Sequence, residues 1–229
     1  YLIDCGEGTQ FQLRKYHISL RRIHYIFISH LHGDHFFGLI GLMNTMHLLG
    51  RKEVLEIFGP AMLEEIITIQ LQASMTQLNY PVVFRVLTEE DHLILENEKL
   101  TVKSFPVRHR IPAFGFVFRE KNPPRKISSP RSFAYCGDTA YFEEIIPWVS
   151  GVSLLYHEAT FMQDLLHAAE SKFHSTAMQA ATIAKKARVQ RLLLGHFSAR
   201  YDDPMPLLNE ALSVFNESML AVEGEQINL

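Results

Sequence analysis

The sequence predicts an α/β protein (α+β in its mixture of elements) with two β-sheets and helices outside them in one domain. Short apolar runs typical of buried strands alternate with helical patterns through most of the 229 residues. Between residues 82 and 118 the pattern changes to several short β-like runs separated by turn residues. No internal repeat or low-complexity tract is present, and the length allows a sizeable core.

The individual elements follow from local patterns. Strands are predicted at 1–4, 25–29, 54–58, 82–87, 92–95, 100–107, 114–118, 132–136, 152–156 and 192–194. Helices are predicted at 36–49, 60–77, 175–187 and 204–215, with Pro60 in a first turn and Ser175 as an N-cap. Because an apolar strand at residue 1 needs neighbours to cover its faces, we expect further residues to precede the sequence shown.

The composition limits the functional classes. Hydrophobic residues make up 47% and charged residues 21%, as in ordinary globular proteins, and no apolar stretch is long enough to span a bilayer. Cys5 and Cys136 do not form a disulfide framework, which favours a reducing, cytoplasmic setting. A net charge of -3 argues against a surface that binds nucleic acid everywhere.

The most informative segment directly follows the apolar run that ends at Ser29. His30, His32, Asp34 and His35 lie within six positions, and Gly33 permits a sharp turn between them. Imidazole nitrogens and carboxylate oxygens suit zinc and its first-row neighbours. The cluster therefore predicts a metal site, with two metals favoured. The chain has 12 His, and isolated ones such as His24, His47 and His92 are interpreted as structural.

Three further ligand candidates each follow a predicted strand. His109 follows residues 100–107, Asp138 follows 132–136 and His196 follows 192–194. Any one of them alone is more typical of a turn residue. Together with the first cluster they reinforce one another, because loops after strand ends are where α/β proteins place chemistry.

These seven residues resemble the ordered ligand set of the metallo-β-lactamase superfamily. A narrower similarity, to the RNase Z family of tRNA 3′-processing endoribonucleases, covers nearly the whole chain. It rests on residues 2–10 (Leu-Ile-Asp-Cys-Gly-Glu-Gly-Thr-Gln), 157–161 (His-Glu-Ala-Thr-Phe), 174–176 (His-Ser-Thr) and 195–201 (Gly-His-Phe-Ser-Ala-Arg-Tyr). The first ligand motif indicates only the superfamily, whereas residues 2–10 and 157–160 are far more specific.

The resemblance implies a metallo-β-lactamase-like αββα four-layer sandwich, with two mixed β-sheets flanked by helices, formed by residues 1–229 as a single domain. It also implies additional N-terminal strands. In this family the segment between the ligands matching His109 and Asp138 usually includes a protruding arm, which holds the tRNA. Here that interval is short, and the loop at 121–131 marks the position of a missing or omitted arm.

The resemblance also assigns roles. Two Zn²⁺ ions are implied, although other divalent metals also suit the ligands. His30, His32 and His109 would hold one, Asp34, His35 and His196 the other, and Asp138 would bridge them. A metal-bound hydroxide would attack the phosphodiester and leave a 3′-hydroxyl on the tRNA, with Asp34 orienting the water and accepting its proton. His174 is the candidate donor to the leaving oxygen, with Glu158 holding its imidazole.

The leading hypothesis is thus a zinc-dependent endoribonuclease that removes 3′ trailers from precursor tRNA as a homodimer. Ser198 and Arg200 are predicted to contact phosphate, because a guanidinium suits phosphate geometry. Phe36 and Phe37 could stack a base or belong to a helix core. One alternative is a hydrolase of small phosphodiesters, sulfates or thioesters with the same metals. Another, a metal-free RNA-binding or scaffold protein, ranks last because all seven ligand positions are filled.

Overall fold

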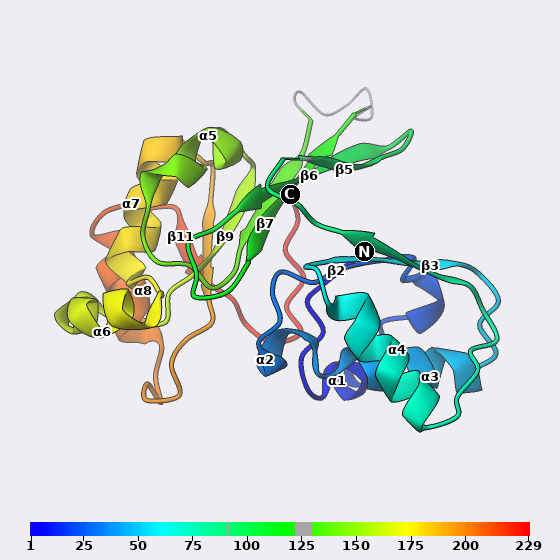
Figure 1. Ribbon diagram of the computed structural model, residues 1–229. Coiled ribbons are helices and arrows are strands. Elements are labelled where there is room, and N and C mark those ends of the chain that lie inside the picture. Colours follow the sequence, from blue (N-terminus) through cyan, green and yellow to red (C-terminus); the bar gives the residue numbers. More distant parts are fainter. Residues whose placement is uncertain (91, 122–129) are drawn as a thin grey trace. The chain divides into compact units, whose positions relative to one another are not determined.

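The computed structural model describes residues 1–90, 92–121 and 130–229 (Figure 1). The chain divides into two compact units, an N-terminal unit of residues 1–88 and a C-terminal unit of residues 89–229. Most of the loop predicted at 121–131 therefore lies outside the described residues. Among the described helices, none combines the length and apolarity that crossing a membrane requires.

The N-terminal unit contains a four-stranded sheet in the order β1-β2-β3-β4, with every pair parallel. Its strands are β1 (Leu2–Ile3), β2 (Tyr25–Phe27), β3 (Leu55–Gly59) and β4 (Val82–Val86). Its helices are α1 (Thr9–Lys15), the 3-10 turn η1 (Leu20–Arg22), α2 (Gly33–Phe36), α3 (Leu39–Leu48) and α4 (Leu63–Ala73). Figure 1 shows α1, α3 and α4 on one face of this sheet.

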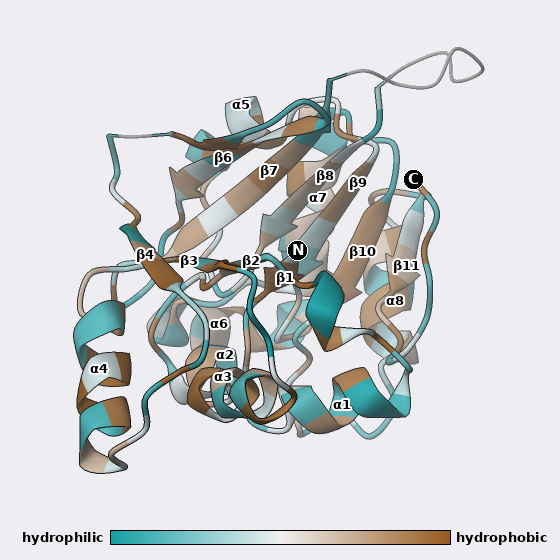
Figure 2. Ribbon diagram, turned by 90° about the vertical axis from the view of Figure 1, so that its right-hand side faces the viewer, coloured by the Kyte–Doolittle hydropathy of each residue, from teal (hydrophilic) through white to brown (hydrophobic). Residues whose placement is uncertain are grey.

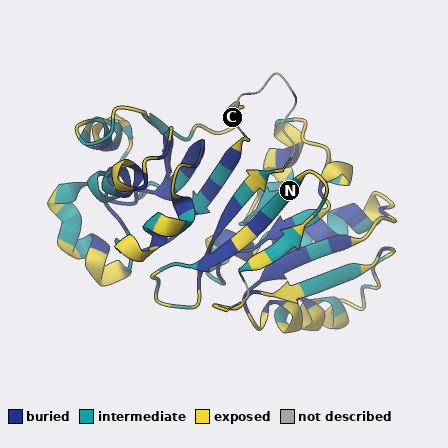
Figure 3. Ribbon diagram, turned by 90° about the horizontal axis from the view of Figure 1, so that it is seen from above, coloured by how far each residue is buried: buried dark blue, intermediate teal, exposed yellow. Residues whose placement is uncertain are grey.

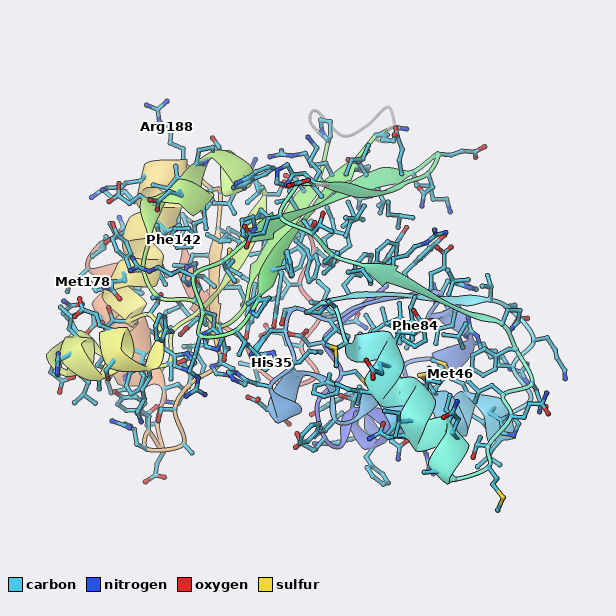
Figure 4. All side chains as sticks on the ribbon, in the orientation of Figure 1. His35, Met46, Phe84, Phe142, Met178 and Arg188 are labelled. Carbon is cyan, nitrogen blue, oxygen red and sulfur yellow. The ribbon has the colours of Figure 1, made fainter. Side chains whose placement is uncertain are left out.

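The core of this unit joins that face of the sheet to the helices. Ile26 and Ile57 from the strands pack with Leu42 and Met46 of α3, and all four side chains are buried. Met46 and Phe84, which is partly buried against this core, are labelled in Figure 4. Hydrophilic and hydrophobic bands alternate along α4 in Figure 2, as expected for a helix with one face in a core.

Close backbone contact ties the loop after β1 to the short helix α2. The Cys5 N–H donates to the His35 carbonyl at 2.7 Å, and the Gly38 N–H donates to the Cys5 carbonyl at 2.9 Å. A Cβ on Gly6 would lie 2.0 Å from the Asp34 carbonyl oxygen, and one on Gly38 would lie 1.9 Å from the Gly6 carbonyl oxygen. Glycine is therefore required at both positions, and the segment at 2–10 serves to seat α2.

The C-terminal unit contains a seven-stranded sheet in the order β11-β10-β9-β8-β7-β6-β5. Its strands are β5 (Leu93–Glu96), β6 (Leu100–Pro106), β7 (Phe114–Glu120), β8 (Ser132–Cys136), β9 (Leu154–Glu158), β10 (Leu192–Gly195) and β11 (Ser218–Leu220). Pairing is antiparallel from β5 to β8 and parallel from β8 to β11. The carboxyl ends of β8, β9 and β10 therefore lie along one edge of the sheet.

Helices pack on this sheet around a second core. They are η2 (Glu143–Ile145), α5 (Ile146–Val149), η3 (Gln163–Leu165), α6 (Leu166–Lys172), α7 (Ala177–Ala187) and α8 (Met205–Leu212). Ala180 and Ala184 of α7 are fully buried against Leu155 and Leu194 of the strands, because small side chains let the helix approach closely. Figure 3 shows this pattern as dark blue, buried positions along the strands and yellow, exposed positions on outer helix faces.

Two sheets with flanking helices are present, as the predicted fold class requires. Only the second sheet is mixed, however, because the four described strands of the first are all parallel. The predicted helix at 60–77 begins later, at Leu63, so that Pro60 precedes its first turn. Ser175 is not the N-cap of α7. Thr176 is, in a capping box with Gln179.

We predict that Gly6→Ala destabilises the chain, because its Cβ would press on the Asp34 carbonyl. Overpacking of this kind typically costs about 1–3 kcal/mol in the free energy of unfolding. Urea unfolding should detect this loss. Gly41→Ala is the matched control, because a Cβ there meets only the end of the Gln10 side chain, at 3.3 Å. Equal stability of the Gly6→Ala and Gly41→Ala proteins would contradict the proposed role of Gly6.

Candidate metal centre

The N-terminal unit gathers one set of ligand atoms just after β2. His30 is fully buried, and its Nε2 lies 3.0 Å from Nδ1 of His32. Asp34 and His35 belong to α2, and Asp34 Oδ2 lies 3.5 Å from His35 Nε2. Figure 4 labels His35 at this helix. The structure thus brings together the four ligand candidates that the sequence predicted in this segment.

Asp4, directly after β1, fixes the orientation of two of these rings. Its carboxylate accepts from the Ser29 N–H at 2.7 Å, from the Ser29 hydroxyl at 2.9 Å and from His35 Nδ1 at 2.8 Å. Because the Ser29 hydroxyl donates to Asp4, it accepts from His30 Nδ1, 3.0 Å away. In neutral His30 and His35 the proton is then on Nδ1, and Nε2 keeps a lone pair for a cation.

The C-terminal unit gathers a second set along the edge where β6, β8 and β10 end. Asp138 follows β8 and is nearly buried, at 4% exposure. One carboxylate oxygen, Oδ1, lies 3.2 Å from His196 Nε2, and the other, Oδ2, lies 4.0 Å from Nε2 of His109 and of His174. The three His rings therefore surround one carboxylate, and Asp138, His174 and His196 form a group with metal-ligand spacing.

Acceptors behind these rings also set which nitrogen faces inward. His109 Nδ1 donates to the Phe173 carbonyl at 3.0 Å, and His174 Nδ1 donates to Glu158 Oε1 at 2.8 Å. His196 Nδ1 lies 3.0 Å from the Thr160 hydroxyl oxygen. Each Nε2 is thereby directed at Asp138, an arrangement typical of metal-ligating histidines.

Glu158 is the anchor of this second set. Its side chain is fully buried, yet its carboxylate accepts five hydrogen bonds. The backbone N–H groups of Thr139, Thr160 and Ser175 donate to it, as do the Thr160 hydroxyl and His174. A buried carboxylate is tolerated when its oxygens are satisfied in this way. Glu158 therefore ties the loops after β8 and β9 to the entrance of α7.

Asp4, behind the first ligand set, and His196, in the second, adopt strained backbone conformations. Asp4 and His196 have φ of 56° and 57°, in the left-handed region that non-glycine residues rarely occupy. Such strain persists only where the surroundings impose it, and it clusters at functional sites. Both residues lie at strand ends, where the turn directs their side chains into the ligand sets.

The ligand atoms of both sets suit a divalent cation. They are Nε2 nitrogens with a free lone pair and carboxylate oxygens, all of them electron-rich. Atoms of this kind repel one another at such short range unless a positive charge lies among them. Imidazole with carboxylate is a donor set that zinc accepts. Neither cysteine competes for this role. Burial raises the pKa of Cys5 to about 12, despite the opposing effect of a Thr9 hydrogen bond, and burial also strongly raises the pKa of Cys136.

The remaining sequence-based candidates are distributed as follows. Ser198 and Arg200 lie in the loop after His196, where Arg200 Nε donates to the Ser198 hydroxyl at 3.0 Å. The Arg200 guanidinium lies 4.8 Å from the Phe161 ring centroid, and that ring borders His174. Phe36 is buried in the N-terminal core, whereas Phe37 is 58% exposed.

Sequence reasoning missed three groups that support the two ligand sets: Asp4 in the N-terminal unit, and Thr160 and the Phe173 carbonyl in the C-terminal unit. Asp4 carried a usable signal, because it follows a predicted strand just as Asp138 does. Thr160 lies in the specific segment at 157–161, but its hydroxyl role depends on His196, which is 36 positions away. The Phe173 carbonyl carries no side-chain signal at all. His157 is buried, and burial lowers its pKa, which agrees with its structural interpretation.

The model of the beta-lactamase superfamily domain matches residues 1–197. Ribonuclease Z of Bacteroides fragilis is 41% identical over 271 aligned positions, which cover 100% of this chain and 89% of that protein. Ribonuclease Z of Azobacteroides pseudotrichonymphae is 42% identical over 249 positions, covering 97% and 86%.

A solved structure supports the same assignment. The crystal structure of the short form of human tRNase Z matches with a TM-score of 0.82 and 35% identity, covering 99% of this chain and 86% of that one. The chain belongs to the ribonuclease Z family of the beta-lactamase superfamily.

We predict that Thr160→Val weakens zinc binding, because it removes the hydroxyl that orients His196. Loss of such an outer contact typically lowers metal affinity about 10- to 100-fold. Thr160→Ser should restore most of the affinity, and Thr182→Val is the control, since the Thr182 hydroxyl only donates to the Met178 carbonyl within α7. Competition with a chromogenic chelator would measure the affinity. An unchanged affinity in Thr160→Val would refute this role.

Proposed function

We propose that the ligand sets of the two units act on the same pair of zinc ions. As a member of the ribonuclease Z family, the chain is a metal-dependent endoribonuclease that processes the 3′ end of precursor tRNA. In our assignment His30, His32 and His109 would hold one ion, Asp34, His35 and His196 would hold the other, and Asp138 would serve both. Bound there, the ions would supply positive charge to the scissile phosphate and lower the pKa of water.

The residues of the chain would then divide the proton transfers between them. Asp34, whose side chain is 62% exposed, would orient the attacking water and accept its proton. When its ring is protonated on both nitrogens, His174 would donate the Nε2 proton to the leaving 3′ oxygen of the tRNA, while Glu158 keeps the hydrogen bond from Nδ1. Attack by water and departure of that oxygen leave a 3′-hydroxyl on the tRNA and a 5′-phosphate on the trailer.

The main support for this proposal is that the segments most specific to the family are the ones that position the ligand candidates and His174. Residues 2–10 supply Asp4, which orients His35, and Gly6, which seats α2. Residues 157–161 supply Glu158 and Thr160, which orient His174 and His196. A hydrolase that shared only the superfamily's ligands would not need these particular supports.

Substrate contacts are proposed for the loop after His196. Arg200 is exposed, and its guanidinium packs on Phe161 while Nε holds Ser198. This arrangement restricts the Arg200 side chain, so that less conformational freedom is lost when it binds a phosphate. We propose Ser198 and Arg200 as phosphate contacts, precursor tRNA as the partner, and a homodimer as the assembly.

The short interval between His109 and Asp138 leaves a second function open. The alignment with the Bacteroides fragilis relative spans 271 positions against 229 residues here, so it contains at least 42 positions that this chain lacks. If the tRNA-binding arm is among them, a smaller phosphodiester becomes the competing substrate. The metal centre and its proton transfers would serve either substrate.

The decisive assay compares a 3′-extended precursor tRNA with bis-p-nitrophenyl phosphate. We predict cleavage of the precursor at the trailer junction, with a 3′-hydroxyl product detected by end-labelling. Hydrolysis of the small ester beside an intact precursor would sink the tRNA proposal and favour the alternative.

Two variants separate the proposed proton transfers. Asp34→Ala should abolish turnover with the fold retained, as judged by circular dichroism. His174→Ala should slow cleavage about 10²- to 10⁴-fold, the usual contribution of a general acid, while leaving zinc content nearly unchanged. Marked zinc loss in His174→Ala would instead make His174 a ligand, and wild-type turnover in Asp34→Ala would refute its role.

A further inference from the structure

A cavity of about 300 Å³ lies in the C-terminal unit beside the ligand set. Its walls are Arg108, Ala140, Tyr141, Glu170, Phe173 and Gln179. This volume is at the lower end of the range for small-molecule sites, which run from about 300 to 1,000 Å³. It suits a single nucleotide unit and excludes a double helix.

The walls belong to the same segments that carry the centre. Arg108 precedes His109, and Phe173 precedes His174 while its carbonyl accepts from His109 Nδ1 at 3.0 Å. The Ala140 N–H donates to the Arg108 carbonyl at 2.7 Å, which joins the loop after Asp138 to the loop before His109. A ligand in this cavity would therefore lie next to the residues proposed to act on the scissile phosphate.

The walls combine aromatic surface with two opposite charges. Tyr141 and Phe173 offer rings on which a base can stack. Arg108 and Glu170 are both exposed, and among the residues that the structure describes no ion pair joins them. Both charges are therefore available to a ligand. Glu170 disfavours a bare phosphate here, whereas a carboxylate accepts hydrogen bonds from the amino group of a base.

We propose that this cavity binds one unpaired guanine base of the RNA next to the cleaved bond. Guanine presents two acceptors, O6 and N7, to a guanidinium such as that of Arg108. It also presents two donors, N1–H and the N2 amino group, to a carboxylate such as that of Glu170. Adenine, cytosine and uracil cannot form both paired contacts. The location beside the cleaved bond rests on the proposed function, whereas the binding itself does not.

Direct binding tests the proposal without requiring cleavage. The four ribonucleoside 5′-monophosphates differ only in the base, so any contact of the phosphate is common to all of them. NMR titration of the full chain should show GMP binding at least about tenfold tighter than AMP, CMP and UMP. Glu170→Ala and Arg108→Ala should each remove this preference, whereas Glu217→Ala, which deletes an exposed carboxylate outside the cavity, should keep it.

Two results would overturn the proposal: equal affinity for all four nucleotides, or a GMP preference that both cavity variants retain. Precursors with each base on either side of the cleaved bond extend the test to the reaction. We expect kcat/KM about tenfold higher for guanine on one side, with the difference lost in Glu170→Ala. Cleavage indifferent to base identity would refute the cavity's role in the reaction. If the protein binds GMP selectively but cleaves no precursor, the result would count against the proposed function and not against the cavity's binding of guanine.

Discussion

In each unit, imidazole nitrogens and carboxylate oxygens must stay close together although, as hydrogen-bond acceptors, they repel one another. Each unit meets this constraint with acceptors placed behind the rings. In the N-terminal unit the Asp4 carboxylate and the Ser29 hydroxyl hold His35 and His30. In the C-terminal unit the Phe173 carbonyl, Glu158 and Thr160 hold the three rings around Asp138. A cation bound among the ligand atoms would remove this repulsion, and the relief would contribute to the free energy of metal binding.

The supports differ in kind between the two units. In the N-terminal unit, packing of backbone against backbone positions the ligands, since the Asp34 carbonyl approaches Gly6 so closely that no side chain fits between them. In the C-terminal unit a single buried carboxylate, Glu158, collects donors from three separate loops. Loss of Glu158 would therefore disturb the proposed proton donor and a proposed ligand together, because the Thr160 hydroxyl behind His196 and the His174 ring both depend on it.

Much of the fold and of the centre could be predicted from the sequence. Strand 132–136 matches β8 residue for residue, and the alternation of strands and helices led to the correct fold class. The ligand candidates were recognisable because each follows a strand and carries a metal-binding side chain. Other contributions depend on long-range packing and carry no local signal. The Phe173 carbonyl reaches His109 across 64 positions, and the N-cap of α7 shifts to Thr176 because Ser175 is engaged with the Thr139 carbonyl.

If both units hold the same metal ions, as we propose, removing one ligand from each unit should cost no more zinc than removing either ligand alone. His32→Ala, His109→Ala and the double variant should be compared with the wild type by elemental analysis after dialysis. We expect two zinc ions per wild-type chain and one in each single variant. The double variant should also keep one ion, because both histidines would serve the same ion. A double variant that has lost both ions, while each single variant has lost a different one, would contradict the shared centre.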